Sequence, residues 1–209
     1  MPPAHALFAL LVVLVGCATP RAAHPVWSGP VCGVDLRPVV TAHDADLRRV
    51  FDLVAAVARP DLPRARYTDV PAVKLEVVAV ERPWRERHHV AGVCRRGSVA
   101  LVVVNAAALP ELLRHGAVPL ATVLGHELAH VTLDHEATGE RVPAFELEAD
   151  ELGMYYAQRA GFPCRSVVGS SYDTDAARMW PDPAKYRAAV AAACAGAMRG
   201  VRPAGRFSR

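Results

Sequence analysis

Two histidines and a glutamate, spaced as His-Glu-x-x-His, are the residues of this chain best suited to chemistry. His126 and His130 are four positions apart, which on an α-helix places them about 40° apart around the axis, so both imidazoles can bind one ion. Glu127 lies beside them, where a general base for metal-assisted hydrolysis is needed. The alternative interpretation is a pair of ordinary histidines on a buried helix.

A second pair of acidic residues follows on the next predicted helix. Glu146 and Asp150 are also four positions apart, and one turn of chain is enough to bring this helix back antiparallel to the first. Glu146 is then expected to complete a His-His-Glu zinc site with one open position. Asp150 is expected to accept the distal N–H of a ligand histidine, with His126 the favoured partner. The alternative for Glu146 is a solvated helical carboxylate.

Other histidines and acids near these motifs are expected to stay outside the metal site. His135 follows His130 by five positions, a rotation of about 140° on a continuous helix, so it is predicted to face elsewhere. Glu148 is rotated by about 200° from Glu146 and is not expected to bind the ion. His88 and His89 are adjacent and predicted to be exposed residues of a hairpin, because neighbouring strand residues point to opposite sides.

The periodicity of the chain predicts an α+β fold in which two active-site helices pack against a small β-sheet. Helices are expected over 44–59, from Pro119 through the His-Glu-x-x-His motif, over 143–160, and from Pro183 to about residue 199. Strands are expected over 73–80 and 98–104. The segment 99–105 is expected at a sheet edge beside the cleft, where an extended peptide substrate can add as a further strand.

The composition indicates one globular domain that does not bind nucleic acid. The chain has 209 residues, of which 52% are hydrophobic and 22% charged, and this excludes an extended disordered protein. With 24 basic and 21 acidic residues the net charge is +3, too small an excess for a nucleic-acid surface. Residues 201–209 are predicted to be a disordered tail.

The combined motifs resemble those of a known peptidase family. His-Glu-Leu-Ala-His at 126–130 and Glu-Leu-Glu-Ala-Asp at 146–150, with Gly153 and Ala-Gly-Phe at 160–162, are similar to the gluzincin zinc peptidases that include the CAAX prenyl protease and the bacterial HtpX protease. The likeness covers about residues 95–165 and is closest to periplasmic lipoprotein members. It implies a minimal gluzincin domain over 32–200, with zinc ligands His126, His130 and Glu146, the base Glu127 and a supporting carboxylate at Asp150.

The resemblance also implies an endopeptidase that acts on misfolded or unassembled envelope proteins. The chain departs from the family in having no histidine after His135. The group that stabilises the oxyanion therefore stays open among Tyr155, Tyr156, Tyr172, Arg178 and Arg187. Two rival hypotheses remain: a zinc-bearing periplasmic chaperone or assembly factor with little or no proteolysis, and a degenerate domain without metal.

The N-terminus predicts export and a lipid anchor. Residues 1–16 read as a signal peptide, and Leu14-Val15-Gly16-Cys17 resembles the lipobox of bacterial lipoproteins, although no Lys or Arg precedes the apolar run. The resemblance implies lipidation of Cys17, a tether over 17–31 and attachment to the periplasmic face of the outer membrane; a plain secretory signal is the alternative. In an oxidising compartment the other cysteines suggest two disulfides, and Cys32–Cys94 with Cys164–Cys194 is the preferred of three pairings.

Overall fold

The computed structural model of the chain describes residues 30–31, 34–35, 37–62, 74–81, 90–96, 98–114, 116–135, 143–168 and 182–203. The predicted signal peptide and most of the tether lie outside these ranges, as does most of the predicted disordered tail. The residues of interest that also lie outside them are Cys17, Cys32, His88, His89, Tyr172 and Arg178.

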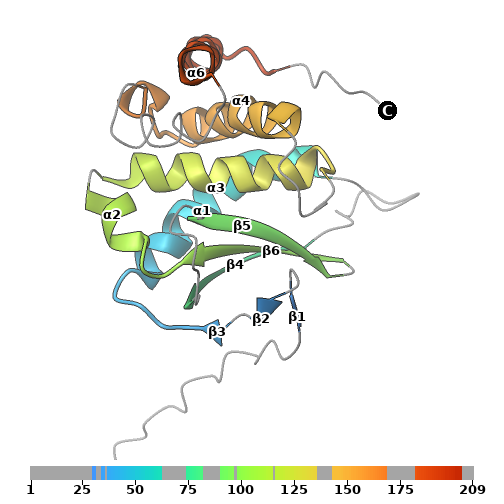
Figure 1. Cartoon of the computed structure of the whole chain (residues 1–209), viewed down its shortest axis with the longest axis vertical. Helices are drawn as coiled ribbons and strands as arrows, with labels where there is room; N and C mark the ends of the chain where they lie inside the picture. Colours follow the sequence, from blue (N-terminus) through green and yellow to red (C-terminus); the bar gives the residue numbers. More distant parts are fainter. Residues whose placement is uncertain are drawn as a thin grey trace, which may run out of the picture.

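The described strands form one mixed sheet and one small pair. The sheet has the order β3-β4-β6-β5, with β3 at Arg37–Pro38, β4 at Lys74–Glu81, β5 at Ala91–Arg96 and β6 at Val99–Asn105 (Figure 1). β4 and β6 are parallel, while β5 runs antiparallel to β6 and β3 antiparallel to β4. β1 (Pro30–Val31) pairs separately with β2 (Val34–Asp35). The strands predicted at 73–80 and 98–104 are confirmed, but β5 was not predicted.

The expectation that residues 99–105 form a sheet edge is wrong. β6 lies between β4 and β5 and is paired on both sides, so it has no edge to offer a peptide. Its inner residues are all buried, as in a strand covered on both faces. Its continuous run of apolar residues is the sequence signature of such an interior strand. Within the described residues, β5 is the outer strand on this side of the sheet.

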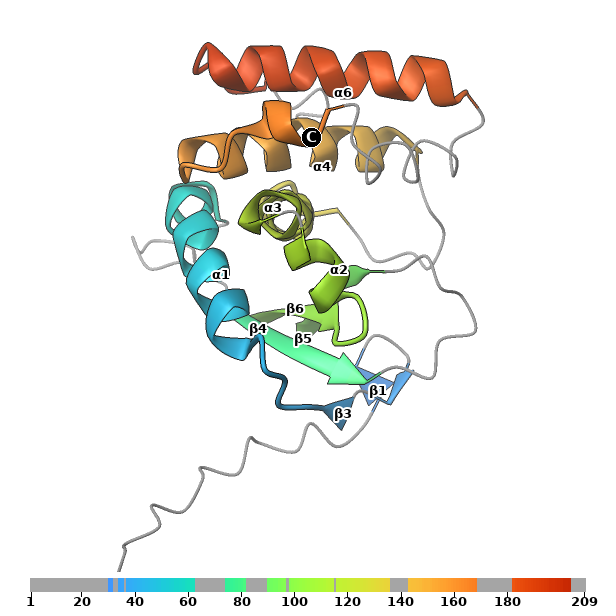
Figure 2. The ribbon, with the colours of Figure 1, turned by 90° about the vertical axis from the view of Figure 1, so that its left-hand side faces the viewer.

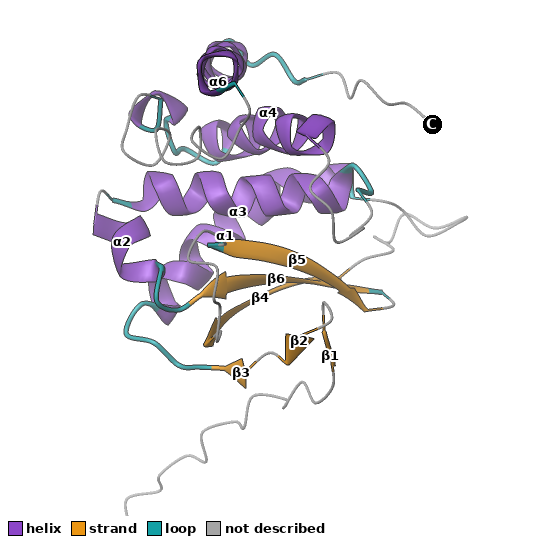
Figure 3. Cartoon of the chain, viewed as in Figure 1, coloured by secondary structure: helices purple, strands orange, loops and turns teal. Residues whose placement is uncertain are grey.

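The helices stack in layers on one side of the sheet. α1 (Asp44–Ala58) and α3 (Ala117–Thr132) lie against the sheet, α4 (Pro143–Arg159) packs on α3, and α6 (Pro183–Met198) packs on α4 (Figure 2). The short α2 (Leu109–Arg114) links β6 to α3, and single 3-10 turns lie at Arg59–Asp61 and Cys164–Ser166. Figure 3 shows this segregation of helices from strands, which makes the fold α+β as expected.

The main hydrophobic core lies between the sheet and α3. From the sheet it takes Val102 and Val104, and from α3 it takes Leu120, Leu124 and Leu128. α3 is buried around most of its circumference because α4 covers the side that faces away from the sheet. The helix that carries the predicted metal ligands is therefore held by packing along its whole length.

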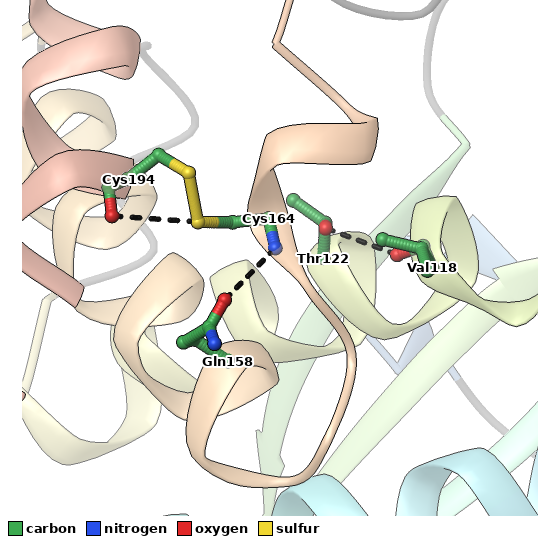
Figure 4. The surroundings of a disulfide bond; sticks show 5 residues. All are labelled: Val118, Thr122, Gln158, Cys164 and Cys194. Atoms are coloured by element: carbon green, nitrogen blue, oxygen red, sulfur yellow. Dashed lines mark hydrogen bonds between the residues drawn. A yellow bond between two sulfur atoms is a disulfide. The ribbon is translucent and has the colours of Figure 1, made fainter. Parts of the chain in front are cut away.

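The outermost helix is attached to the layer beneath it by a disulfide. The predicted bond between Cys164 and Cys194 is confirmed and joins the 3-10 turn after α4 to α6 (Figure 4). Asp182 caps α6 by accepting a hydrogen bond from the Lys185 backbone N–H at 2.9 Å. Cys94 is also disulfide-bonded, but Cys32 lies outside the described residues, so the pairing of these two stays a prediction. No helix in the described ranges combines the length and apolar character that a membrane span requires.

Candidate metal centre

α3 and α4 meet backbone to backbone next to the predicted ligands. A Cβ atom placed on Gly125 would lie 2.5 Å from the carbonyl oxygen of Gly153, and one placed on Gly153 would lie 2.5 Å from the backbone nitrogen of His126. No side chain larger than hydrogen fits either position unless the helices separate. This close approach lets the short carboxylates of α4 reach the imidazoles of α3.

The three predicted ligands converge on one point between the two helices. The Nε2 atoms of His126 and His130 lie 3.0 Å apart, and the two carboxylate oxygens of Glu146 lie near them, Oε2 at 3.6 Å from the first and Oε1 at 3.7 Å from the second. Ligands bound tetrahedrally at about 2.0–2.1 Å lie roughly 3.3 Å from one another, so this spacing suits a small ion. Among the described residues, these three side chains form the one group of this kind that can hold a metal ion.

Asp150 holds the first of these histidines from behind. Its Oδ1 atom lies 2.8 Å from Nδ1 of His126, which leaves Nε2 of that ring facing Glu146. Burial alone would lower the pKa of His126, but the nearby carboxylates of Asp150, Glu127 and Glu146 outweigh it and raise the pKa to about 9. Only the neutral imidazole binds metal, so a metal ion would displace the extra proton whose binding to His126 this raised pKa favours. The carboxylate is therefore placed where the sequence predicted it.

The prediction that His135 faces away from the metal site is wrong. Its Nδ1 atom lies 3.0 Å from Nδ1 of His130. α3 ends at Thr132, and Asp134 adopts a left-handed backbone with φ of 57°, so the helix does not continue to position 135. The N–H of His135 donates back to the carbonyl of His130 at 3.0 Å, as in a Schellman motif. The chain reversal brings His135 beneath His130.

Glu148 is the second residue that was predicted to lie outside the metal site. Its Oε2 atom lies 3.2 Å from Nε2 of His135, and the side chain is buried beneath α3. Its other oxygen, Oε1, has no hydrogen-bond partner among the described residues. The ring of Phe145 stacks on His135 with 4.4 Å between centroids, which holds that imidazole in place. The pairing of His135 with Glu148 could have been suspected only if the end of α3 had been placed correctly.

Glu127 lies in the chain next to a ligand set that is partly exposed. The side chains of His126, His130 and Glu146 retain 17–19% of their exposure. Glu127 is half-buried and adjacent to His126, whose pKa its charge helps to raise. The carboxylate of Glu127 is therefore close enough to the ligand set to act on it electrostatically.

Comparison with known proteins adds no neighbour. No family model, curated protein or solved structure matches the chain. The gluzincin resemblance therefore rests on the residues of the two sequence motifs alone.

Among the oxyanion candidates inside the described ranges, Tyr156 is removed by its contacts. Its hydroxyl is fully buried and donates to Asp61 at 2.8 Å, on the side of α4 where the 3-10 turn after α1 packs. Arg187 is exposed on the outer helix α6. Tyr155, half-buried on α4, remains the candidate that the geometry leaves open.

Proposed function

We propose that the protein is a zinc-dependent endopeptidase. The observation that carries the proposal is the convergence of the Nε2 atoms of His126 and His130, 3.0 Å apart, with the carboxylate of Glu146, whose two oxygens lie 3.6 and 3.7 Å from them. A second acid, Glu127, is next to His126 in the chain. Two histidines and one glutamate on a pair of helices are the ligand set of catalytic zinc, which keeps a fourth position open.

In the proposed hydrolysis, different residues of the chain bind the metal, orient a ligand and transfer the proton. When bound, zinc supplies a Lewis acid that lowers the pKa of water and polarises a carbonyl. His126, His130 and Glu146 would hold it, and Asp150 fixes the orientation of the His126 ring. Glu127 accepts a proton from the attacking water and passes it to the leaving amine, so that the carboxylate is regenerated at the end of the cycle.

Misfolded or unassembled envelope proteins as the substrates, and the lipid anchor at Cys17, rest on the sequence resemblances alone.

The proposal is tested by digestion of unfolded casein with the zinc-loaded full-length protein in detergent. Glu127→Gln is expected to lower the rate by at least about 100-fold while zinc stays bound, because it removes the general base and keeps the three ligands. Chelation should abolish cleavage, and added zinc should restore it.

The matched control is Glu111→Gln, which neutralises an exposed glutamate on α2 and should cleave as the wild type does. A zinc-loaded wild type that is as inert as Glu127→Gln would contradict the peptidase proposal. Zinc binding together with capture of unfolded casein without cleavage would instead identify a client-binding protein.

A further inference from the structure

The two ligand histidines are supported from behind in different ways. His126 meets the carboxylate of Asp150 directly, at 2.8 Å. His130 meets a second imidazole, that of His135, at 3.0 Å, and only then a carboxylate, that of Glu148, at 3.2 Å. Each ligand histidine is therefore supported by a buried or half-buried carboxylate. Asp150 contacts His126 directly, whereas Glu148 reaches His130 only through the ring of His135.

We propose that His135 and Glu148 are positioning residues that fix His130 in the tautomer able to bind metal. This inference rests on the proposed zinc site and adds two residues to it. In the proposed arrangement His130 donates its Nδ1–H to Nδ1 of His135, and His135 donates its Nε2–H to Oε2 of Glu148.

The direction of these hydrogen bonds follows from the geometry of the cluster. Nε2 of His130 faces Nε2 of His126 and the carboxylate of Glu146, so this nitrogen must carry its lone pair when an ion binds. The proton of a neutral His130 then lies on Nδ1, and the facing Nδ1 of His135 has to accept it. A neutral His135 that accepts at Nδ1 carries its own proton on Nε2. Oε2 of Glu148 lies opposite that proton, and an ionised carboxylate can accept a hydrogen bond but cannot donate one.

The opposite direction of donation would block the site. If His135 carried its proton on Nδ1, it would donate to His130, and the proton of His130 would move to Nε2, into the space for the ion. Glu148 disfavours this arrangement, because a bare nitrogen of His135 would then face a buried carboxylate without a proton between them. The carboxylate of Glu148 therefore determines, through His135, which nitrogen of His130 carries the proton.

The local structure holds the intervening ring still. Phe145 stacks on His135 with an interplanar angle of 11°, and the backbone N–H of His135 is bonded to the carbonyl of His130. A ring fixed at both its face and its backbone cannot turn freely to exchange its two nitrogens. The preference imposed by Glu148 is thereby passed to His130.

The first test compares zinc affinities by competition with a chromogenic chelator, using the full-length protein. His135→Phe keeps a ring to stack on Phe145 but removes the acceptor, and we expect it to weaken zinc binding by about 10–100-fold. His135→Asn restores an acceptor oxygen near the position of Nδ1 and should recover part of this loss. The matched control is His43→Phe, the same exchange at the N-cap position of α1, which should leave the affinity unchanged.

The second test reads the tautomers directly and needs no substitution. Long-range proton–nitrogen correlation spectra of the zinc-loaded wild type should show His130 protonated at Nδ1 and His135 protonated at Nε2. In Glu148→Leu the signals of His135 should report a mixture of both tautomers, with weaker zinc binding. A residue that served only to stabilise the fold would leave these nitrogen shifts unchanged.

The outcomes separate this inference from the function on which it rests. Tight zinc binding by folded His135→Phe, or a His135 protonated at Nδ1 in the loaded wild type, would overturn the inference and leave the zinc peptidase standing. Glu148→Leu with wild-type tautomers and affinity would remove Glu148 from the proposal. A wild type that binds no zinc would refute the proposed function first and the inference with it.

Discussion

At the scale of single residues, the buried polar groups of this protein do two different kinds of work. Asp150, Glu148 and His135 lie behind the ligand histidines, where they determine which ring nitrogen is available to an ion. Tyr156 lies on the same helix as the two acids, but its contacts lead away from the site. It donates to Asp61, which also forms an ion pair with Arg202 at 3.0 Å, and it lies 3.0 Å from the hydroxyl of Thr132.

We therefore predict that Tyr156→Phe lowers stability without changing the metal site. At neutral pH the free energy of unfolding should fall by about 1–2 kcal/mol, because the substitution deletes a buried hydrogen bond to a carboxylate and leaves that carboxylate less well satisfied. Urea denaturation followed by circular dichroism measures this loss. Zinc affinity should stay at the wild-type value, and a large fall would place Tyr156 in the site after all.

The same substitution should change how stability depends on alkaline pH. Burial, with the charge of Asp61 adding to it, raises the pKa of Tyr156 well above its usual value of about 10. The neutral form is thus favoured in the folded state, so its contribution is complete below about pH 10 and is lost progressively as the pH rises further. Between pH 9 and pH 11 the unfolding free energy of Tyr156→Phe should fall less steeply than that of Tyr155→Phe, the matched control. Equal slopes would contradict the assignment.

At the scale of elements, the contact between α3 and α4 sets the geometry of the site. Gly125 precedes a ligand directly, and Gly153 lies one turn beyond Asp150, so the point of closest approach is part of the cluster's framework. Separation of the helices by a methyl group would move Glu146 and Asp150 away from both imidazoles together. Precision in ligand placement therefore depends on backbone contact between two helices rather than on the ligands themselves.

Gly153→Ala should consequently cost both stability and metal. An added Cβ would meet the backbone of His126 at 2.5 Å, with no flexible side chain to yield, and we expect a loss of about 2–4 kcal/mol in unfolding free energy. Zinc affinity should fall by at least about 10-fold. The control is Gly196→Ala on α6, where nothing lies within 4 Å; the lower entropy of the unfolded chain should stabilise it by about 0.5–1 kcal/mol. Unchanged zinc binding in folded Gly153→Ala would show that the contact does not set the site.

The spacing of residues within a helix was the part of the site that the sequence could predict. His126 with His130, and Glu146 with Asp150, are separated by four positions inside strong helices, so regular geometry places them. His135 was misplaced because the same regularity was extended past Thr132, where a left-handed aspartate ends the helix. An aspartate in that conformation leaves a weaker sequence signal than the glycine usual at helix ends.

Strand order was beyond the sequence for a similar reason. The apolar runs of β4 and β6 predicted strands, but pairing depends on contacts between segments distant in the chain. β5 was missed because its residues include Gly92 and two arginines, which weaken the β pattern. Its place as the outer strand next to β6 in the described sheet is a property of the whole sheet. The location of the outer strand therefore came from the structure.

At the scale of the whole molecule, the candidate metal site and the outer helix α6, which covers α4, lie in different layers of the fold. α4 lies between α3 and α6 in both views of the ribbon (Figures 1 and 2). Its inner face supplies Glu146 and Asp150 to the histidines of α3, while its outer face packs against α6. The outer cluster is small and separate from the main core. It is formed by Met154, Cys164, Tyr186, Val190, Cys194 and Ala197. A cluster of this size gains much of its stability from the disulfide within it.

The double variant Cys164→Ala/Cys194→Ala tests whether this division is real. The closed loop spans a separation of 30 residues, for which the entropy of the unfolded chain predicts a loss of about 3–4 kcal/mol in unfolding free energy. Zinc affinity should remain within about twofold of the wild type, because the ligands lie on α3 and on the face of α4 that packs against α3, and effects at separate sites add independently. Urea denaturation and chelator competition measure the two quantities on the same sample. If zinc binding weakened in step with stability, α6 would belong to the framework of the metal centre, and the cover would have to be counted as part of the active site.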